Sequence, residues 1–91
     1  MMRVRYIGPS FGAFGLTNGK VYECLGVELD GQALRVIDDE GYAYWELEPD
    51  EKEGYLYSAK HPAPMDGSVS GGHFEIVEDD ERGSLHRAIF G

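Results

Sequence analysis

Apolar residues alternate with polar ones in much of the middle third of the chain, and this two-residue period is typical of β-strands. The pattern predicts three consecutive strands, over Gly19–Leu29, Ala33–Ile37 and Tyr42–Leu47. Asp30-Gly31 lies between the first two and is typical of a type I′ hairpin turn, because both residues tolerate a positive φ. The run 38–41 begins with an Asp and ends with a Gly, so we expect a second hairpin there.

The apolar residues of the first of these strands change faces near Gly26. One face carries Tyr22 and Cys24, and the other carries Leu25, Val27 and Leu29. A glycine inside a strand often marks a bulge or a bend. We therefore expect a bulge at Gly26 that lets one strand serve both halves of a small barrel.

Three further segments have the composition or the alternation of strands. The first strand is predicted over Arg3–Ile7 and the last over His73–Glu78. A short additional strand is predicted over Tyr55–Ser58. We expect the last strand to lie beside the first and to close the sheet.

The segment after the last strand shows a weaker helical pattern. Acids at 79–81 precede it, and acids suit the positive end of a helix dipole. Three apolar residues are spaced to share one side of a short helix over 82–90: Leu85, Ile89 and Phe90. Gly83 weakens this prediction, because glycine disfavours a helix interior.

With 91 residues the chain has room for one domain with a small core. We expect residues 1–78 to form a single all-β domain, an antiparallel barrel of about five strands. Residues 48–72 form a long insertion, a loop or an extra hairpin, and its part over 60–72 is rich in Gly, Pro and small residues. Residues 79–91 form an acidic tail.

Three blocks of this sequence, Leu16–Glu23, Leu34–Trp45 and Phe74–Glu78, carry a family resemblance. They resemble the LTxGKxYEV opening, the RIIDDSGEDYLY hairpin and the closing FEIVE strand of small uncharacterised proteins from Gram-positive bacteria and their phages. The resemblance implies an SH3-like β-barrel and implies no catalytic or binding residues. The chain departs from the pattern over 48–72 and after Glu78, so we expect a function particular to this protein in those segments.

Charge is unevenly distributed in this chain of net charge −9. Residues 1–37 hold four basic and three acidic residues, a net of +1, whereas residues 38–91 hold four basic and fourteen acidic residues, a net of −10. Such a surface repels phosphate groups, so we expect no direct nucleic-acid binding and no attachment to an anionic membrane. A basic protein partner is favoured, although acids also serve solubility alone.

The single cysteine, Cys24, excludes a disulfide framework within the chain, so we expect a reducing, cytoplasmic location. The first residues show no apolar signal segment, and no apolar window approaches the length of a membrane-spanning helix. Glu23 beside Cys24 does not favour a thiolate, so we expect Cys24 to be a core residue.

Metal-binding and catalytic patterns are weak in this sequence. The three histidines, His61, His73 and His86, are spaced 12 and 13 residues apart and match no zinc motif, although His61 and His73 could meet near Asp66. The acidic runs 38–40 and 79–81 do not match a calcium loop. We therefore predict no enzymatic activity and no cofactor.

Aromatic residues next to acids provide the strongest candidate site. Proteins of the SH3-like type bind cations and proline-rich segments through exposed aromatic rings beside acidic loops. The predicted binding residues are Tyr42, Tyr44, Tyr55, Tyr57, Asp38, Asp39 and Glu40, with Trp45 and Leu47 directed inward. We expect a non-enzymatic interaction module whose partner is a protein with a basic or proline-rich surface.

Three alternatives stay open. The acidic half could imitate nucleic acid and inhibit a host DNA-binding protein. The chain could be a small metal-binding or enzymatic protein. It could also associate with a second copy through the apolar residues of the tail or through an unpaired edge strand.

Overall fold

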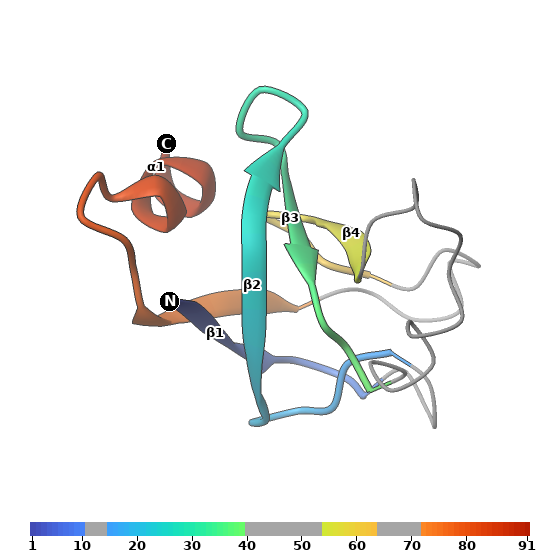
Figure 1. The fold of residues 1–91 in the computed structure, drawn as a ribbon. Helices are drawn as coiled ribbons and strands as arrows, with labels where there is room; N and C mark the ends of the chain where they lie inside the picture. The colour runs from blue at the N-terminus through green and yellow to red at the C-terminus, as the bar shows by residue number, and fades with distance from the viewer. Residues whose placement is uncertain (11–14, 40–53, 64–71) are drawn as a thin grey trace, which may run out of the picture.

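The computed structural model describes residues 1–10, 15–39, 54–63 and 72–91. Within these ranges five antiparallel strands form one sheet and a short helix follows the last strand (Figure 1). The elements are β1 (Met2–Ile7), β2 (Val21–Glu28), β3 (Ala33–Val36), β4 (Tyr55–Ser58), β5 (His73–Glu78) and α1 (Ser84–Phe90). The predicted all-β fold of five antiparallel strands is confirmed.

The sheet is open, so the predicted closure of a barrel is wrong for the part of the chain that the structure describes. The strand order is β4-β3-β2-β1-β5, which leaves β4 and β5 at the two edges. β1 pairs with both β2 and β5, so the last strand does lie beside the first, as predicted. Figure 1 shows a strongly twisted sheet in which β1 and β5 cross the direction of β2 at a steep angle.

The β2–β3 hairpin has the predicted turn and the predicted bulge. Asp30 and Gly31 have φ values of 56° and 87°, and the Gln32 N–H donates to the Leu29 carbonyl at 3.1 Å, as in a type I′ turn. The pairing of β2 with β3 shifts register between Cys24 and Gly26, so the intervening residue bulges out of the ladder. The bulge explains why the buried phase of β2 ends at Cys24.

The neighbours of β3 differ from the sequence prediction. β3 lies between β2 and β4, with Leu34 opposite Tyr57 and Val36 opposite Tyr55. The strand predicted over Tyr42–Leu47 lies outside the described residues. The short strand predicted at Tyr55–Ser58 is confirmed, so part of the predicted insertion belongs to the sheet.

The core lies between the concave face of the sheet and α1. Its buried members are Val4, Tyr6, Leu16, Tyr22, Cys24, Leu34, Val36, Ala59, Phe74, Leu85, Ala88 and Ile89. The rings of Tyr6 and Phe74 meet edge to face with centroids 6.2 Å apart. This cluster joins strands from both ends of the described chain.

Helix α1 buries Leu85, Ala88 and Ile89, but Phe90 is 66% exposed. The prediction that Phe90 shares the buried side is therefore wrong. Five residues separate it from Leu85, which turns its side chain about 140° away from that of Leu85. Residues at spacings of three and four, Ala88 and Ile89, occupy the buried side instead.

Two of the acids predicted ahead of the helix hold its first turn. Asp79 accepts hydrogen bonds from the N–H groups of Leu85 at 2.9 Å and His86 at 3.1 Å, and Asp80 accepts one from Ser84 at 2.8 Å. The hydrogen bonds from Ser84 lower the pKa of Asp80 below its ordinary value. Gly83 has a φ of 69° and ends the preceding turn, so the helix begins at Ser84.

Candidate functional site

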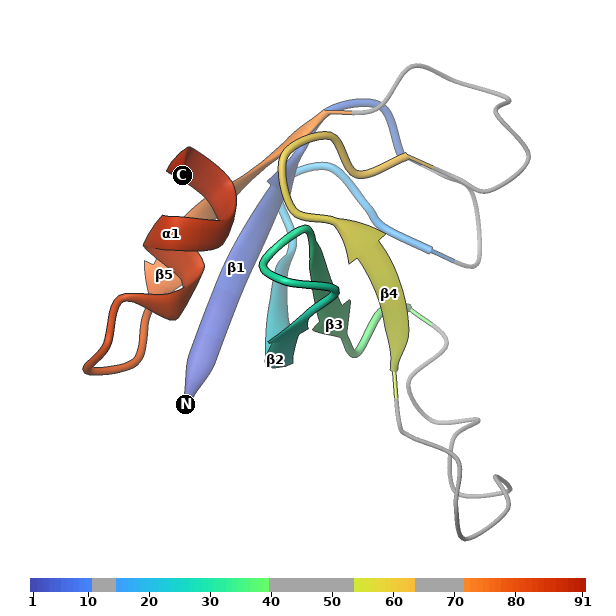
Figure 2. The same ribbon diagram turned by 90° about the horizontal axis from the view of Figure 1, so that it is seen from above.

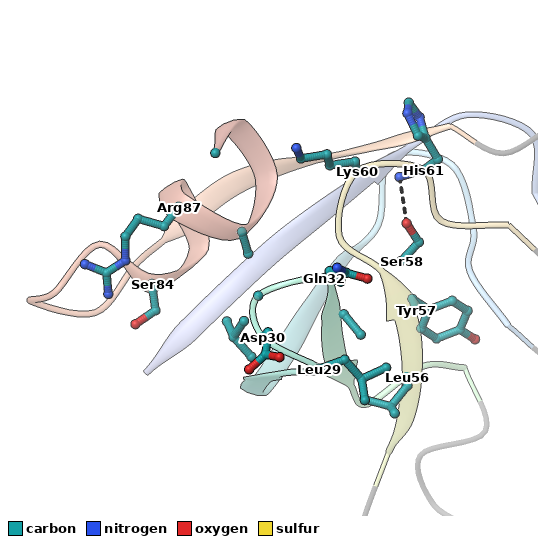
Figure 3. A pocket seen from close by; sticks show the side chains of 15 residues that line it. Leu29, Asp30, Gln32, Leu56, Tyr57, Ser58, Lys60, His61, Ser84 and Arg87 are labelled. Atoms are coloured by element: carbon teal, nitrogen blue, oxygen red, sulfur yellow. Dashed lines mark hydrogen bonds between the residues drawn. The ribbon is translucent and has the colours of Figure 1, made fainter.

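A groove opens between the β2–β3 turn, β4 with the segment after it, and α1 (Figure 3). Figures 1 and 2 both show α1 and β4 on opposite sides of this turn. The groove has a volume of about 1000 Å³. We call this site the groove, and its lining includes Leu29, Asp30, Leu56, Lys60, His61 and Arg87.

Two exposed leucines form the apolar part of the groove. Leu29 precedes Asp30 in the hairpin turn and is 64% exposed, and Leu56 on β4 is 38% exposed. Leu56 pairs with Arg35 and so points to the face opposite the buried Leu34 and Val36. Figure 3 shows the side chains of Leu29 and Leu56 at the same end of the groove.

Leu29 has an unusual backbone conformation. Its φ of 54° lies in the left-handed region, which costs a residue with a Cβ about 1–2 kcal/mol. Burial does not offset this cost, because the side chain is mostly exposed. Strained residues of this kind are concentrated at functional sites, so Leu29 is a candidate contact residue.

Two cations of the groove, Lys60 and Arg87, form no ion pair with a residue of the described ranges. Across residues 1–10, 15–39, 54–63 and 72–91, no carboxylate lies within ion-pair distance of Lys60 or Arg87. Lys60 extends toward the end of α1 in Figure 3, and a Cβ placed on Gly91 would lie 3.3 Å from its Nζ. The His61 N–H donates to Ser58 Oγ at 3.2 Å and so stabilises the turn that carries Lys60. The groove therefore presents free positive charge.

Several other charged side chains of the described ranges form ion pairs within the chain. These ion pairs join Arg3 to Glu78, Lys20 to Asp39 and Arg35 to Glu28. Arg35 contacts both carboxylate oxygens of Glu28 and donates to the Gly54 carbonyl at 3.1 Å. Its guanidinium joins β2, β3 and the start of β4, which is a structural role.

The predicted acidic site residues that the structure describes face their own chain. Asp38 is only 7% exposed and accepts a hydrogen bond from the Tyr57 hydroxyl at 2.6 Å. Its carboxylate is therefore not part of an exposed surface. Tyr57 is half-buried and Tyr55 is exposed. The remaining predicted site residues, Tyr42, Tyr44 and Glu40, lie outside the described ranges, as do Trp45 and Leu47.

Asp39 is the centre of a saturated polar cluster, which we call the Asp39 cluster. Its carboxylate accepts from Lys20 Nζ at 2.7 Å, Thr17 Oγ1 at 2.8 Å and the Tyr22 hydroxyl at 3.0 Å. The Tyr22 oxygen in turn accepts from the Thr17 N–H at 2.6 Å. Burial opposes ionisation of Asp39, but these donors outweigh it and hold the pKa of its carboxyl below the ordinary value.

In the part of the chain that the structure describes, the reactive residue types lie apart from one another. Cys24 is buried, and burial raises the pKa of its thiol, as expected of a core residue. His61 lies at the groove, His73 on β5, and His86 packs against Phe90 with ring centroids 5.1 Å apart. Among the described residues no three His, Cys, Asp or Glu side chains gather to hold a metal ion.

Sequence reasoning missed the groove. Its contributors, Leu29, Leu56, Lys60 and Arg87, come from a turn, a strand, a loop and a helix that only the folded chain brings together. One local signal was present, because an apolar Leu29 directly before Asp30-Gly31 occupies a turn position. A large apolar residue at the tip of a hairpin is a useful indication of an exposed contact.

No family model, curated protein or solved structure matches this chain. The resemblance to small proteins of Gram-positive bacteria and phages therefore stays a prediction. In the described ranges no helix has the length and apolar character needed to cross a membrane. The chemistry of the groove is thus the basis for assigning a function.

Proposed function

We propose that this protein is a non-enzymatic interaction module that binds a partner protein in the groove. The observation that carries the proposal is the exposure of Leu29 and Leu56 beside the unpaired Lys60 and Arg87 on one concave surface. Apolar side chains surrounded by polar ones, with shape to receive another surface, are typical of protein contact sites.

The conformation of Leu29 supports this proposal. A glycine or an asparagine would adopt its left-handed backbone at lower cost. The leucine side chain adds little to the core, since it is mostly exposed. Contact with a partner gives this side chain a role that the isolated domain does not.

The groove is a better candidate than the aromatic and acidic surface predicted from the sequence. That surface needs free carboxylates at positions 38 and 39, whereas Asp38 binds Tyr57 and Asp39 binds Lys20, Thr17 and Tyr22. We retain Tyr55 as an extension of the proposed binding surface, because it is exposed on β4, the strand that carries Leu56. A cytoplasmic location is likewise proposed, in keeping with the free thiol of Cys24.

The nucleic-acid mimic is less well supported. A mimic presents a row of free carboxylates to its target, but many acids of the described ranges accept hydrogen bonds from their own chain. These are Glu28, Asp38, Asp39, Glu78, Asp79 and Asp80. Their charge is used in part for folding.

Quantitative affinity capture from the native cells tests the proposed function. The bait proteins are the wild type, a Leu29→Ser/Leu56→Ser variant and a Leu25→Ser/Val77→Ser control with two exposed apolar residues away from the groove. We expect at least one protein to be retained by the wild type and the control and lost by the groove variant. Recovery of the same proteins by all three baits, with thermal denaturation showing that each is folded, would contradict the proposal.

A further inference from the structure

We infer that the segment bound in the groove is acidic: a stretch of a partner protein that carries carboxylates next to a large apolar side chain. This inference rests on the proposed function and assigns the chemistry of its partner. It differs from the basic or proline-rich partner expected from the sequence.

The charge of the groove is opposite to that of the molecule. The chain as a whole has a net charge of −9, yet Lys60 and Arg87 line this site without an acidic partner in the described ranges. Lys20, the other lysine of the described ranges, is paired with a carboxylate, whereas the exposed Arg5 and Arg82 lie outside the groove without one. An acidic segment completes at the groove the kind of pairing that the protein already makes at Lys20.

The arrangement of the lining side chains gives the segment a direction. Figure 3 places Lys60 and His61 at one end of the groove, and Leu29, Leu56 and Asp30 toward the other. Asp30 repels an acid at its own end. The carboxylates of the bound segment therefore lie toward Lys60, and its apolar side chain lies on Leu29 and Leu56.

The size of the groove favours a peptide segment over a small anion. Its volume of about 1000 Å³ is at the upper limit of pockets for small ligands. Lys60 and the two leucines lie at separate ends of the groove, so one occupant needs several side chains to reach both. The Arg87 guanidinium points away from Lys60 in Figure 3, and its long exposed side chain has to turn to reach such an occupant.

Backbone amide NMR with synthetic peptides tests the inference. The probes are a short peptide alternating Glu and Leu, and the same peptide with Lys in place of Glu. We expect the acidic peptide to shift the amides of Leu29, Leu56, Lys60 and Arg87, and the lysine peptide to bind at least about tenfold more weakly. We expect the affinity for the acidic peptide to fall between about 50 and 300 mM salt, because exposed ion pairs are screened.

A pair of charge-matched variants identifies the cations responsible. Lys60→Gln/Arg87→Gln removes the two groove cations, and Arg5→Gln/Arg82→Gln removes two exposed cations away from it. We expect the first variant to bind the acidic peptide about tenfold more weakly, and the second to match the wild type. All four substitutions are at exposed positions, so we expect both variants to stay folded, which thermal denaturation checks.

Three results would overturn the inference. They are the absence of amide shifts with the acidic peptide at about 1 mM, equal loss of binding in the two variants, and dimers in sedimentation analysis that the groove variant abolishes. The last result would make a second copy of this chain the occupant. If capture from cells depends on Leu29 and Leu56 while these charge tests fail, the proposed function stands and only the acidic character of the partner is wrong.

Discussion

The groove and the Asp39 cluster use the same residue types in opposite ways. In the cluster, Lys20, Thr17 and Tyr22 each donate a hydrogen bond to one carboxylate, that of Asp39. In the groove, Lys60 and Arg87 have no acidic neighbour among the described residues. The comparison indicates that paired charges stabilise this fold, whereas cations without an ion-pair partner at the groove are available to a partner protein.

Replacing Asp39 with alanine tests the first half of this comparison and should have the largest effect on stability. The substitution leaves the Tyr22 hydroxyl and the Thr17 hydroxyl without their acceptor. We expect the free energy of unfolding to fall by about 2–3 kcal/mol, as for other part-buried networks. Urea denaturation measures this free energy, with Asp30→Ala as the control because Asp30 is an exposed acid of the groove. A smaller loss of stability in Asp39→Ala than in Asp30→Ala would show that the cluster does not stabilise the fold.

The pH dependence of the free energy of unfolding should depend on the Asp39 cluster and not on the groove. Because the pKa of folded Asp39 lies below its ordinary value of 3.8, the folded chain binds fewer protons than the unfolded chain in acid. The contribution of Asp39 is complete above that ordinary value and is lost as the pH falls through the folded pKa. We expect Asp39→Asn to flatten this part of the stability profile between about pH 4 and pH 2.

Two other carboxyl groups of the described ranges set the control for this experiment. The pKa values of Glu78 and Asp80 are also lowered, through hydrogen bonds from Arg3 and Ser84. A residual acid dependence therefore remains in Asp39→Asn. If the pH profile of stability of Asp39→Asn has the same shape as that of the wild type, the role of Asp39 is contradicted. The Lys60→Gln variant is the control and should have the wild-type profile.

Removing only the hydroxyl group of Tyr22 should have a smaller effect. Tyr22→Phe keeps the buried ring but deletes one donor to Asp39 and the acceptor of the Thr17 N–H. We expect a loss of about 1 kcal/mol in urea denaturation. Hydrogen exchange at the Thr17 amide provides a local check, because its protection depends on the Tyr22 oxygen.

The smallest effect on stability is expected in the groove. Lys60→Gln and Arg87→Gln remove charges that pair with no acid of the described chain, so unfolding should change by less than about 0.5 kcal/mol. Binding of an acidic peptide should nevertheless weaken. A loss of stability as large as that of Tyr22→Phe would place these cations with the cluster and remove the contrast.

Local sequence signals predicted much of the sheet. The alternation of apolar and polar residues located four of the five strands, and the composition of Tyr55–Ser58 located β4. The turn was located from Asp30-Gly31 and the bulge from Gly26. These features depend on neighbours in the chain. The position of β4 beside β3 and the openness of the sheet depend on distant segments, so no local pattern contained them.

The candidate site was less predictable for the same reason. The run 38–40 suggested exposed acids, but Asp38 is covered because Tyr57, nineteen residues away, donates to it. The groove needs α1 to pack beside a hairpin turn more than fifty residues earlier in the chain. Charge counts along the sequence could not show which lysines find a carboxylate in space.

Because of the left-handed backbone at Leu29, selection for folding stability and selection for partner binding should favour different residues at this position. Selection of heat-resistant variants, without any demand for binding, should replace this leucine by glycine or asparagine, which relax the turn. A population of this protein that must keep its partner should instead tolerate the strained residue. Deep mutational scanning under the two regimes would then rank the same substitution at position 29 in opposite directions.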